Sequence, residues 1–244
     1  MHAAVRHIHD NAHLLIEEGP KSDAQGKLSE KSVRVMKDSH GTLLLQAKDL
    51  GGYESHPMDF YEWVMAVAQY DPSAGWIAGV VGVHPWEISI MDPRLQQEIF
   101  GTDPDTWTSS PYAPFGRAKR VEGGYLFTGQ WPYSTGTDYS EWVILGGMVT
   151  DDAGNVGDVP DIRHFVLPRS DYEIVEDSWN VMGLSGTGSK NVRMKDVFVP
   201  DYRVVDGAAM MFGAGKPYAD QFRPGAPLYQ MGFSTMFAGA IGAG

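Results

Sequence analysis

The residues best suited to chemistry lie at 129–142, GQWPYSTGTDYSEW. A plain strand would alternate apolar and polar residues, whereas here a small hydroxyl-rich turn, STGT at 134–137, interrupts the pattern. Hydroxyls and backbone N–H groups in such a turn can hold a flat, polar ligand against the neighbouring Trp131 and Tyr133. The segment therefore predicts a ligand-binding turn.

A second glycine-rich segment, GLSGTGSK at 183–190, has two interpretations. A phosphate-binding loop needs a lysine followed by serine or threonine and then a helix, but here Ser189 precedes Lys190. The residues that follow, VRMKDVFVP, are typical of a strand that ends at Pro200. A glycine-rich turn before a strand is the favoured interpretation, and a ligand contact from it stays open.

Histidines supply the candidate metal ligands and acid–base groups. Four of the eight lie near the N-terminus without cysteines or carboxylates at ligand spacing, so we expect a solvated helix face and no metal. His84 differs because it ends an apolar segment directly before Pro85 and Trp86. It either satisfies carbonyl groups at a helix end, the commoner case, or places a polar group at a pocket wall. Trp76 and Ser110 could also line a ligand site, but Trp76 is more often a core aromatic and Ser110 could be an ordinary strand-edge hydroxyl.

Composition restricts the class of protein. With 244 residues, 43% of them hydrophobic, the chain can bury a real core in one or two domains. A net charge of -12 argues against nucleic acid or an anionic membrane surface as the main partner. The absence of cysteine excludes disulfides and thiol catalysis. The N-terminus lacks the apolar core of a signal peptide and no apolar run is long enough to span a bilayer, so we expect a cytoplasmic protein.

The elements that must position these residues begin with helices. Apolar residues recur at helical spacing between Val5 and Ile16, and Ser29 is a candidate N-cap for the next helix. Residues 73–84 are apolar nearly all round and rich in glycine and alanine, which predicts a buried, closely packed helix. A short helix is expected at 93–100.

From about Trp107 the hydrophobic period changes to that of strands. Gly123-Gly124 is a hairpin signal that follows a basic strand at 117–121. Further strand candidates lie at 143–149, 161–167, 172–175 and 191–199. The pattern predicts an antiparallel β domain of about a hundred residues, a small barrel or sandwich. Residues 233–241 then resemble the start of a helix, and we expect the chain to be a fragment.

Four segments in order resemble the acyl-CoA dehydrogenase superfamily. They are DPSAGWIAGVVGVHPW at 71–86, TSSPYAP at 108–114, EGGYLFTGQWPYSTGTDYSEWVILGGMV at 122–149 and DSWNVMGLSGTGSKNVRMKDVFVP at 177–200. The segment Trp-Pro-Tyr-Ser-Thr-Gly, in place of the usual Trp-Ile-Thr-Asn-Gly type, favours the flavin-dependent aromatic monooxygenases of two-component systems. Within them the chain is most similar to hydroxylases of phenolic secosteroids, and more distantly to 4-hydroxyphenylacetate hydroxylase oxygenase components.

The resemblance implies an α+β fold of the acyl-CoA dehydrogenase type. An α-helical domain would occupy 1–105 and a central antiparallel β-barrel domain that contacts the flavin would occupy 106–206. Residues 207–244 would form a linker and the first turns of a C-terminal four-helix bundle that is otherwise missing. Because the bundle forms the tetramer in this family, a homotetramer is expected of the full-length protein.

The resemblance also assigns site residues by motif. Trp76 and His84 would line the flavin and substrate pocket, and Ser134, Thr135 and His84 are the candidate catalytic residues. The expected contacts to the flavin come from Trp76, Ser110, Pro111, Tyr112, Tyr133, Ser134 and Thr135. Relatives commonly have a cysteine where this chain has Thr137, so the turn keeps its hydroxyls.

The implied activity is ortho-hydroxylation of a phenol by reduced flavin and dioxygen, through a flavin C4a-hydroperoxide that needs protection from water. A hydroxyl of Ser134 or Thr135 would hydrogen-bond near flavin N5. The family's usual base is a histidine of the missing bundle, which His84 would assist. Reduced FMN, or FAD, would come from an NAD(P)H-dependent flavin reductase.

Two other functions stay open at this point. The first is oxidation of an acyl thioester by bound FAD, as in acyl-CoA dehydrogenases. The second is a non-catalytic flavin- or partner-binding fragment, which predicts aggregation or association through an exposed bundle-facing surface. Hydroxylation of a phenol by the isolated chain at a normal rate would exclude this second alternative.

Overall fold

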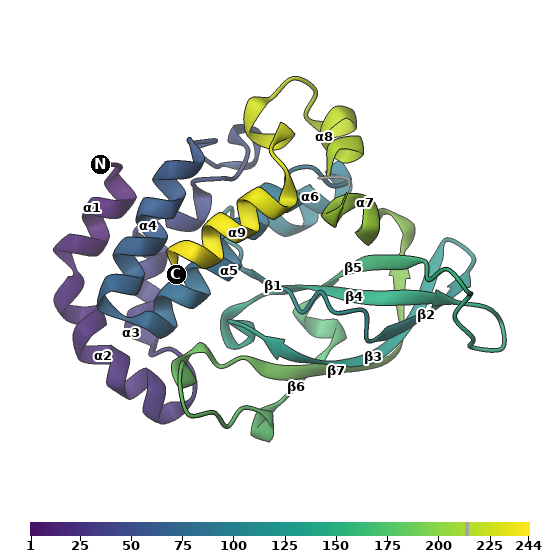
Figure 1. Cartoon of the computed structure of the whole chain (residues 1–244), viewed down its shortest axis with the longest axis horizontal. Coiled ribbons are helices and arrows are strands. Elements are labelled where there is room, and N and C mark those ends of the chain that lie inside the picture. The colour runs from purple at the N-terminus through teal and green to yellow at the C-terminus, as the bar shows by residue number, and fades with distance from the viewer. Residues whose placement is uncertain (213–214) are drawn as a thin grey trace.

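Residues 1–212 and 215–244 are described by a computed structural model of the chain. Most helices gather at one end and strands at the other, and α5 lies between α4 and the sheet (Figure 1). The α-helices before the sheet are α1 (Ala3–Asp10), α2 (Ala12–Gln25), α3 (Glu30–Asp38), α4 (Pro57–Tyr70), α5 (Pro72–Ile88) and α6 (Pro93–Phe100). Those after it are α7 (Gly207–Met211), α8 (Lys216–Phe222) and α9 (Phe233–Ala243).

Helix starts follow capping chemistry that is visible in the sequence. The Ser29 side chain accepts a hydrogen bond from the Ser32 N–H at 3.1 Å, which confirms the expected N-cap of α3. Prolines occupy the first turn of α4, α5 and α6, where a backbone N–H has no partner to lose. The apolar residues between Val5 and Ile16 are helical, but they belong to two helices that Asn11 separates.

Helix α5 is buried on nearly every side. Small residues permit this close packing, since a Cβ at Gly75 would lie 2.3 Å from a side chain of α4. A Cβ at Gly79 would lie 2.9 Å from a carbonyl oxygen of α9. The predicted buried helix at 73–84 is therefore confirmed, and it continues through Pro85 to Ile88.

The strands of the described residues form one eight-stranded sheet. They are β1 (Thr108–Ser109), β2 (Gly116–Val121), β3 (Gly124–Ser134), β4 (Trp142–Thr150), β5 (Ile162–Pro168), β6 (Glu173–Val175), β7 (Lys190–Pro200) and β8 (Val204–Asp206). Their order is β6-β7-β3-β2-β4-β5-β8, and β1 pairs with β4. The expected hairpin joins β2 to β3, where Val121 pairs with Gly124 and Gly123 has a φ of 75°.

The sheet is mixed rather than antiparallel as the sequence led us to expect. Most pairings are antiparallel, but β1 and β2 both run parallel to β4, with Thr108 beside Trp142 and Gly116 beside Gly147. This follows because β3 returns the chain to the end of the sheet where β1 begins, and β4 starts from that end.

Alternation along the strands gives the sheet two buried faces. On β4, Val143 and Leu145 enter a core enclosed by the curved sheet, whereas Trp142 and Ile144 enter the core of the helices. Stacked rings of Phe127 and Phe165, 3.9 Å apart, fill the sheet core. The second face of β4 and β5 is therefore pressed against helices, and side chains from both layers meet there.

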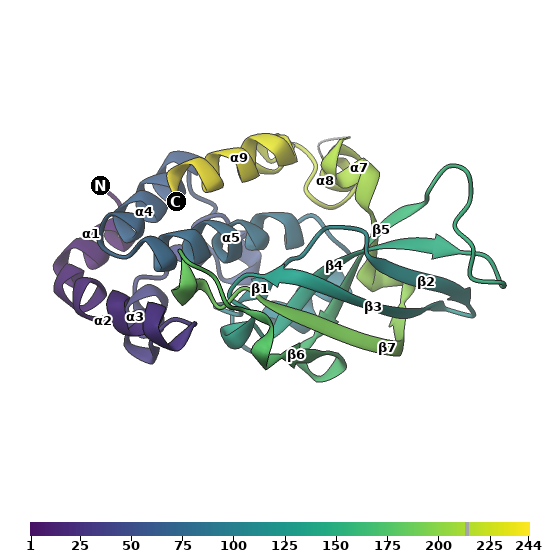
Figure 2. The same ribbon diagram turned by 60° about the horizontal axis from the view of Figure 1, so that its bottom comes forward.

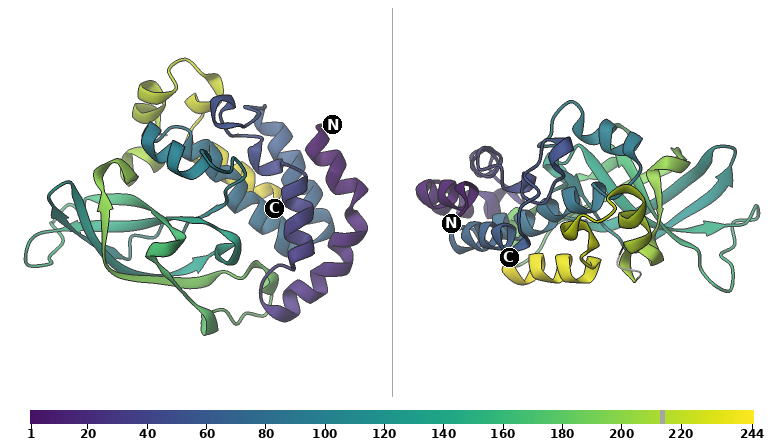
Figure 3. Two further views of the ribbon diagram at one scale, coloured as in Figure 1. Left: turned by 180° about the vertical axis from the view of Figure 1, so that it is seen from behind. Right: turned by 90° about the horizontal axis from the view of Figure 1, so that it is seen from above.

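The helix expected at 233–241 is confirmed as α9, which lies along α4 and α5 (Figures 2 and 3). Within the described ranges, none of the helices combines the length and the apolar character that a membrane crossing requires.

Candidate functional site

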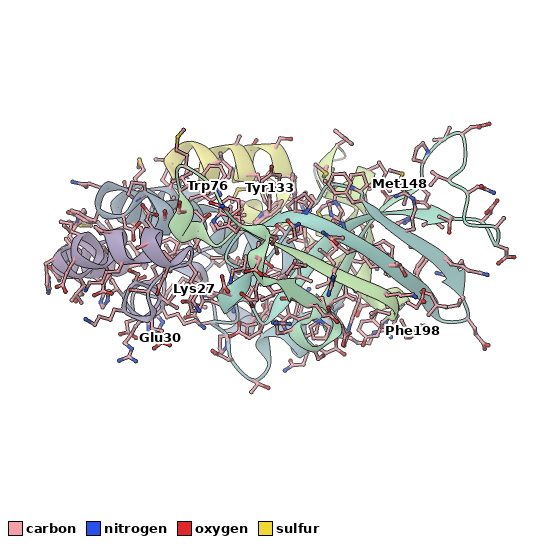
Figure 4. The ribbon with its side chains drawn as sticks, turned by 90° about the horizontal axis from the view of Figure 1, so that it is seen from below. Lys27, Glu30, Trp76, Tyr133, Met148 and Phe198 are labelled. Atoms are coloured by element: carbon pink, nitrogen blue, oxygen red, sulfur yellow. The ribbon has the colours of Figure 1, made fainter. Side chains whose placement is uncertain are left out.

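The hydroxyl-rich turn follows β3 and packs on α5. Tyr133 is 69% exposed and has a φ of 63°, a backbone conformation that non-glycine residues rarely adopt. Gly136 has a φ of 74°, and a Cβ there would lie 3.1 Å from Val81 of α5. Trp76, half-buried near the start of α5, and Tyr133 both lie at the junction of helices and sheet (Figure 4). The turn thus presents aromatic surface beside α5.

The hydroxyls of this turn point into the protein. Ser134 Oγ donates to Ser109 Oγ at 3.1 Å, and both side chains are fully buried. Thr135 Oγ1 lies 2.9 Å from Ser189 Oγ, which is also 2.9 Å from Thr187 Oγ1. These bonds tie the turn to β1 and to the glycine-rich segment at 183–190. That segment leads into β7 and not into a helix, which confirms the expected glycine-rich turn before a strand.

A second group of polar side chains is buried around the C-terminal half of α5. We call His84, Glu87, Tyr112 and His164 the buried polar cluster. Tyr112 Oη donates to Glu87 Oε2 at 2.5 Å and lies 3.2 Å from His84 Nδ1. Glu87 Oε1 lies 3.8 Å from His164 Nδ1, and the side chains of both histidines and of Glu87 are fully buried. Helix α5, the segment after β1, and β5 supply these residues.

His84 does not have the commoner of its two expected roles, which was to satisfy carbonyl groups at a helix end. It does not cap a helix end, because α5 continues past it to Ile88. Its ring instead lies beside Tyr112 and Glu87, with centroids of the His84 and Tyr112 rings 5.9 Å apart. The sequence suggested an earlier end because a proline usually breaks a helix. In this structure Pro85 lies inside α5.

The cluster has strong electrostatic coupling. Burial alone would raise the pKa of Glu87, but His164 and His84 beside it outweigh burial and lower that pKa to about 2. Burial raises the pKa of Tyr112, and the neighbouring Glu87 carboxylate raises it further. Glu87 is therefore ionised and Tyr112 protonated at neutral pH.

Several polar atoms of the cluster lack a hydrogen-bond partner among the described residues. They are His84 Nε2, Glu87 Oε1, and Nδ1 and Nε2 of His164. A buried polar atom without a partner costs about 1–3 kcal/mol. Such a concentration in one place points to a polar ligand group or water that completes the cluster.

An apolar cavity of about 250 Å³ shares a wall with the cluster. Tyr112 belongs to both, and a Cβ at Gly207 in the cavity wall would lie 3.0 Å from His164 Nε2. The cavity is lined by Tyr112, Ala113, Pro114, Ile162, Gly207, Ala208, Met211 and Phe212. An apolar compound with one polar end matches this combination of surfaces.

Helix α9 closes the cluster with aromatic side chains. Phe233 and Phe237 stack with their centroids 4.1 Å apart, and the Phe237 ring lies 5.7 Å from the His84 ring. Both phenylalanines also contact Tyr112 edge-on. The cluster therefore has aromatic, apolar surroundings, in which electrostatic interactions are stronger than in water.

The structure groups the expected site residues into two places. Trp76 and Tyr133 lie at the turn, whereas His84 and Tyr112 lie in the buried polar cluster, about 12 Å further along α5 from Trp76. Ser110 and Pro111 link them, because they follow β1 and precede Tyr112. In the described part of the chain, no three His, Cys, Asp or Glu side chains are arranged to hold a metal ion.

Sequence reasoning missed Glu87 and His164. Glu87 carried a usable signal, since a residue three positions after His84 on a helix shares its face. His164 carried none, because its approach to α5 depends on the pairing of β5 with β4.

The chain is similar to known proteins both in sequence and in structure. No protein-family model matches the chain. A pigment production hydroxylase of Rhodococcus erythropolis is 45% identical over 91% of this chain and 56% of its own length. The oxygenase subunit HsaA of a flavin-dependent monooxygenase from Rhodococcus jostii is 36% identical over 94% of this chain and 58% of its own length.

Further relatives are similar to the chain in sequence or in structure. The oxygenase component of p-hydroxyphenylacetate 3-hydroxylase from Acinetobacter baumannii is 32% identical over 87% of this chain and 51% of its own length. The crystal structure of 3-HSA hydroxylase from Rhodococcus sp. RHA1 superposes with a TM-score of 0.90 at 34% identity, over 99% of this chain and 60% of that one. XiaF from Streptomyces, solved in complex with FADH2 and glycerol, gives 0.79 at 30% identity, over 84% and 51%.

The expected resemblance is therefore confirmed. The chain spans about half to three fifths of the length of these relatives. Over nearly all of its own length, the chain is a homologue of the oxygenase components of flavin-dependent monooxygenases.

Proposed function

We propose that this chain is part of the oxygenase component of a two-component monooxygenase, which uses reduced flavin and dioxygen to hydroxylate a phenol ortho to its hydroxyl group. The observation that carries the proposal is the buried polar cluster beside an apolar cavity. A phenol has the matching shape, with one ionisable hydroxyl on an apolar body. The names of the homologues, which are flavin-dependent hydroxylases and monooxygenases, support the same reaction class.

A flavin fits the junction between the turn and α5. The exposed ring of Tyr133 and the half-buried ring of Trp76 offer aromatic surface there, and the rare backbone conformation of Tyr133 is of the kind found at ligand sites. When bound, reduced FMN or FAD would supply the electrons that activate dioxygen. Ser134 and Thr135 already bond to Ser109 and Ser189, so we propose that they fix the shape of the turn as well as contact the flavin.

The phenol would place its hydroxyl in the buried polar cluster and its apolar body in the cavity. His84 Nε2, buried and without a partner, is the atom that we assign to the phenolic O–H. Withdrawal of that proton increases the electron density on the ortho carbon, where oxygen is to be added. The phenylalanines of α9 would keep water out during this step.

The partners and assembly follow from the same proposal. A NAD(P)H-dependent flavin reductase would supply the reduced flavin, and the complete protein would be a cytoplasmic homotetramer. A second candidate is a flavin-binding portion without catalysis of its own; the chain spans 51–58% of the length of these relatives. Acyl thioester oxidation finds no support in the names of the homologues.

Anaerobic titration separates these possibilities. The chain is mixed with reduced FMN or FAD and a 4-alkylphenol, and oxygen is then admitted while products are followed by mass spectrometry. Flavin binding with formation of a catechol supports the proposal. Flavin binding without product favours the non-catalytic candidate, and reduction of bound oxidised flavin by an acyl-CoA would replace the proposal.

A further inference from the structure

The two ring nitrogens of His84 have different surroundings. Nδ1 lies 3.2 Å from Tyr112 Oη and 3.5 Å from Glu87 Oε2. Nε2 is buried and has no partner among the described residues. A neutral imidazole carries its proton on only one nitrogen, so these surroundings decide which nitrogen is free to accept another.

Both groups that face Nδ1 are hydrogen-bond acceptors. The Glu87 carboxylate, held ionised between two histidines, can only accept. Tyr112 has a single hydroxyl proton, and it is donated to Glu87 Oε2 at 2.5 Å. The Tyr112 oxygen can therefore only accept from His84. Nδ1 must be the protonated nitrogen, and Nε2 is left with its lone pair.

We propose that Glu87 and Tyr112 are positioning residues that hold His84 as its Nδ1–H tautomer, so that Nε2 can accept the proton of a phenolic hydroxyl. The inference rests on the proposed function and assigns two residues to it. In the step, the phenolic O–H bond breaks and an Nε2–H bond forms, with no change of oxidation state. The phenol becomes a phenolate, and the Glu87 carboxylate offsets the positive charge on His84.

His164 lies on the other side of Glu87 from His84. Glu87 lies between the two imidazoles, with Oε2 toward His84 and Oε1 3.8 Å from His164 Nδ1. The His164 ring also packs on Tyr112, with centroids 4.8 Å apart.

No other titratable side chain faces His84 in the described structure. On α5 its ionisable neighbour is Glu87, the segment after β1 brings Tyr112, and β5 brings His164. From helix α9 the apolar ring of Phe237 lies 5.7 Å from the His84 ring. The state of the His84 ring is thus controlled by these three groups.

Nitrogen NMR of the chain labelled in its histidine rings tests the inference without flavin or turnover. The His84 signals are assigned from the spectrum of His84→Asn. In the wild-type chain, Nδ1 is expected to be protonated and Nε2 to carry the lone pair. Glu87→Gln should give a mixture of the two tautomers, because the group that faces Nδ1 is then no longer an obligate acceptor.

Two further variants make the result specific. Tyr112→Phe removes the acceptor at 3.2 Å and should shift the tautomer ratio even if Glu87→Gln does not fold. Glu18→Gln is the matched control, because Glu18 is another buried carboxylate, paired with Lys21 and Lys31 on the N-terminal helices. It should leave the His84 signals unchanged.

The inference is overturned if wild-type His84 carries its proton on Nε2, or if folded Glu87→Gln and Tyr112→Phe chains keep the wild-type tautomer. Failure of the proposed function is a separate result. In that case the tautomer is as expected, but addition of 4-methylphenol does not move the His84 Nε2 signal and no catechol forms.

Discussion

At the scale of single residues, the central feature is a histidine with one satisfied and one open nitrogen. His84 was visible in the sequence as a polar residue in an apolar segment, but its neighbours were not. The carboxylate and hydroxyl that orient it come from one turn further along α5 and from the segment after β1.

Replacement of His84 by asparagine should reduce catechol formation in a single turnover by about 100-fold or more, the usual range for loss of an acid–base group. Flavin binding should change little, because His84 lies in the buried polar cluster and not at the turn. The matched control is His9→Asn, an exposed histidine on α1. Equal product formation by both variants would show that His84 takes no part.

The free energy of unfolding should depend on pH through Glu87. Its pKa falls from 4.5 to about 2 on folding, so its stabilising contribution is complete above pH 4.5 and is lost as the pH falls toward 2. Urea unfolding of wild-type and Glu87→Gln chains across this range measures the effect. The stability of the variant should fall less steeply with acid, and parallel curves would contradict the account.

Tyr133→Ala should weaken binding of reduced flavin about 2–10-fold, which corresponds to the loss of one aromatic contact. Its side chain is 69% exposed, so the folded structure should tolerate the change. Tyr53→Ala, at a tyrosine that is 42% exposed elsewhere, is the control. If calorimetric titration finds the same affinity for reduced flavin in both variants, the flavin does not bind at this turn.

At the scale of elements, α5 is the structural link between the turn and the buried polar cluster. Its first turns bear Trp76, its middle supports Gly136, and its last turns carry His84 and Glu87. The burial of the helix on nearly every side fixes these positions relative to one another. A substitution that disturbs the packing of the turn on α5 is therefore expected to destabilise the folded structure.

Gly136→Ala tests this contact. The backbone there has a φ of 74°, and an added Cβ would lie 3.1 Å from Val81. Gly154→Ala is the matched control, since its φ is 87° but a Cβ would meet nothing within 4 Å. The control should lose about 1–2 kcal/mol of unfolding free energy from backbone strain alone. Gly136→Ala should lose about 1 kcal/mol more; equal losses in thermal unfolding would mean that the turn does not pack on α5.

At the scale of the whole molecule, local signals predicted the elements and non-local pairing decided the site. Ser29 as an N-cap, the helix at 93–100 and the hairpin at Gly123-Gly124 depend on neighbours in sequence, and all are confirmed. The parallel pairing of β1 with β4 joins residues more than thirty positions apart, so no local pattern announced it. His164 reaches the cluster through such pairing and was missed for the same reason.

The motifs of the relatives supplied what local reasoning lacked. They predicted a flavin-dependent monooxygenase, which the homologues support. They assigned His84 to the flavin and substrate pocket and Tyr112 to the flavin contacts, and the structure places these two side chains 3.2 Å apart. They did not predict that Ser134 and Thr135 would turn their hydroxyls toward other protein hydroxyls. That outcome depends on Ser109 and Ser189, which lie in other segments.

The central claim is that this chain and reduced flavin transfer one atom of dioxygen to a phenol. A single turnover under dioxygen labelled with a heavy oxygen isotope, with 4-methylphenol as substrate, tests it most directly. The account predicts 4-methylcatechol that contains one labelled oxygen atom, in an amount that His84→Asn reduces. Catechol that carries oxygen from water, or flavin oxidation with only hydrogen peroxide as product, would contradict it.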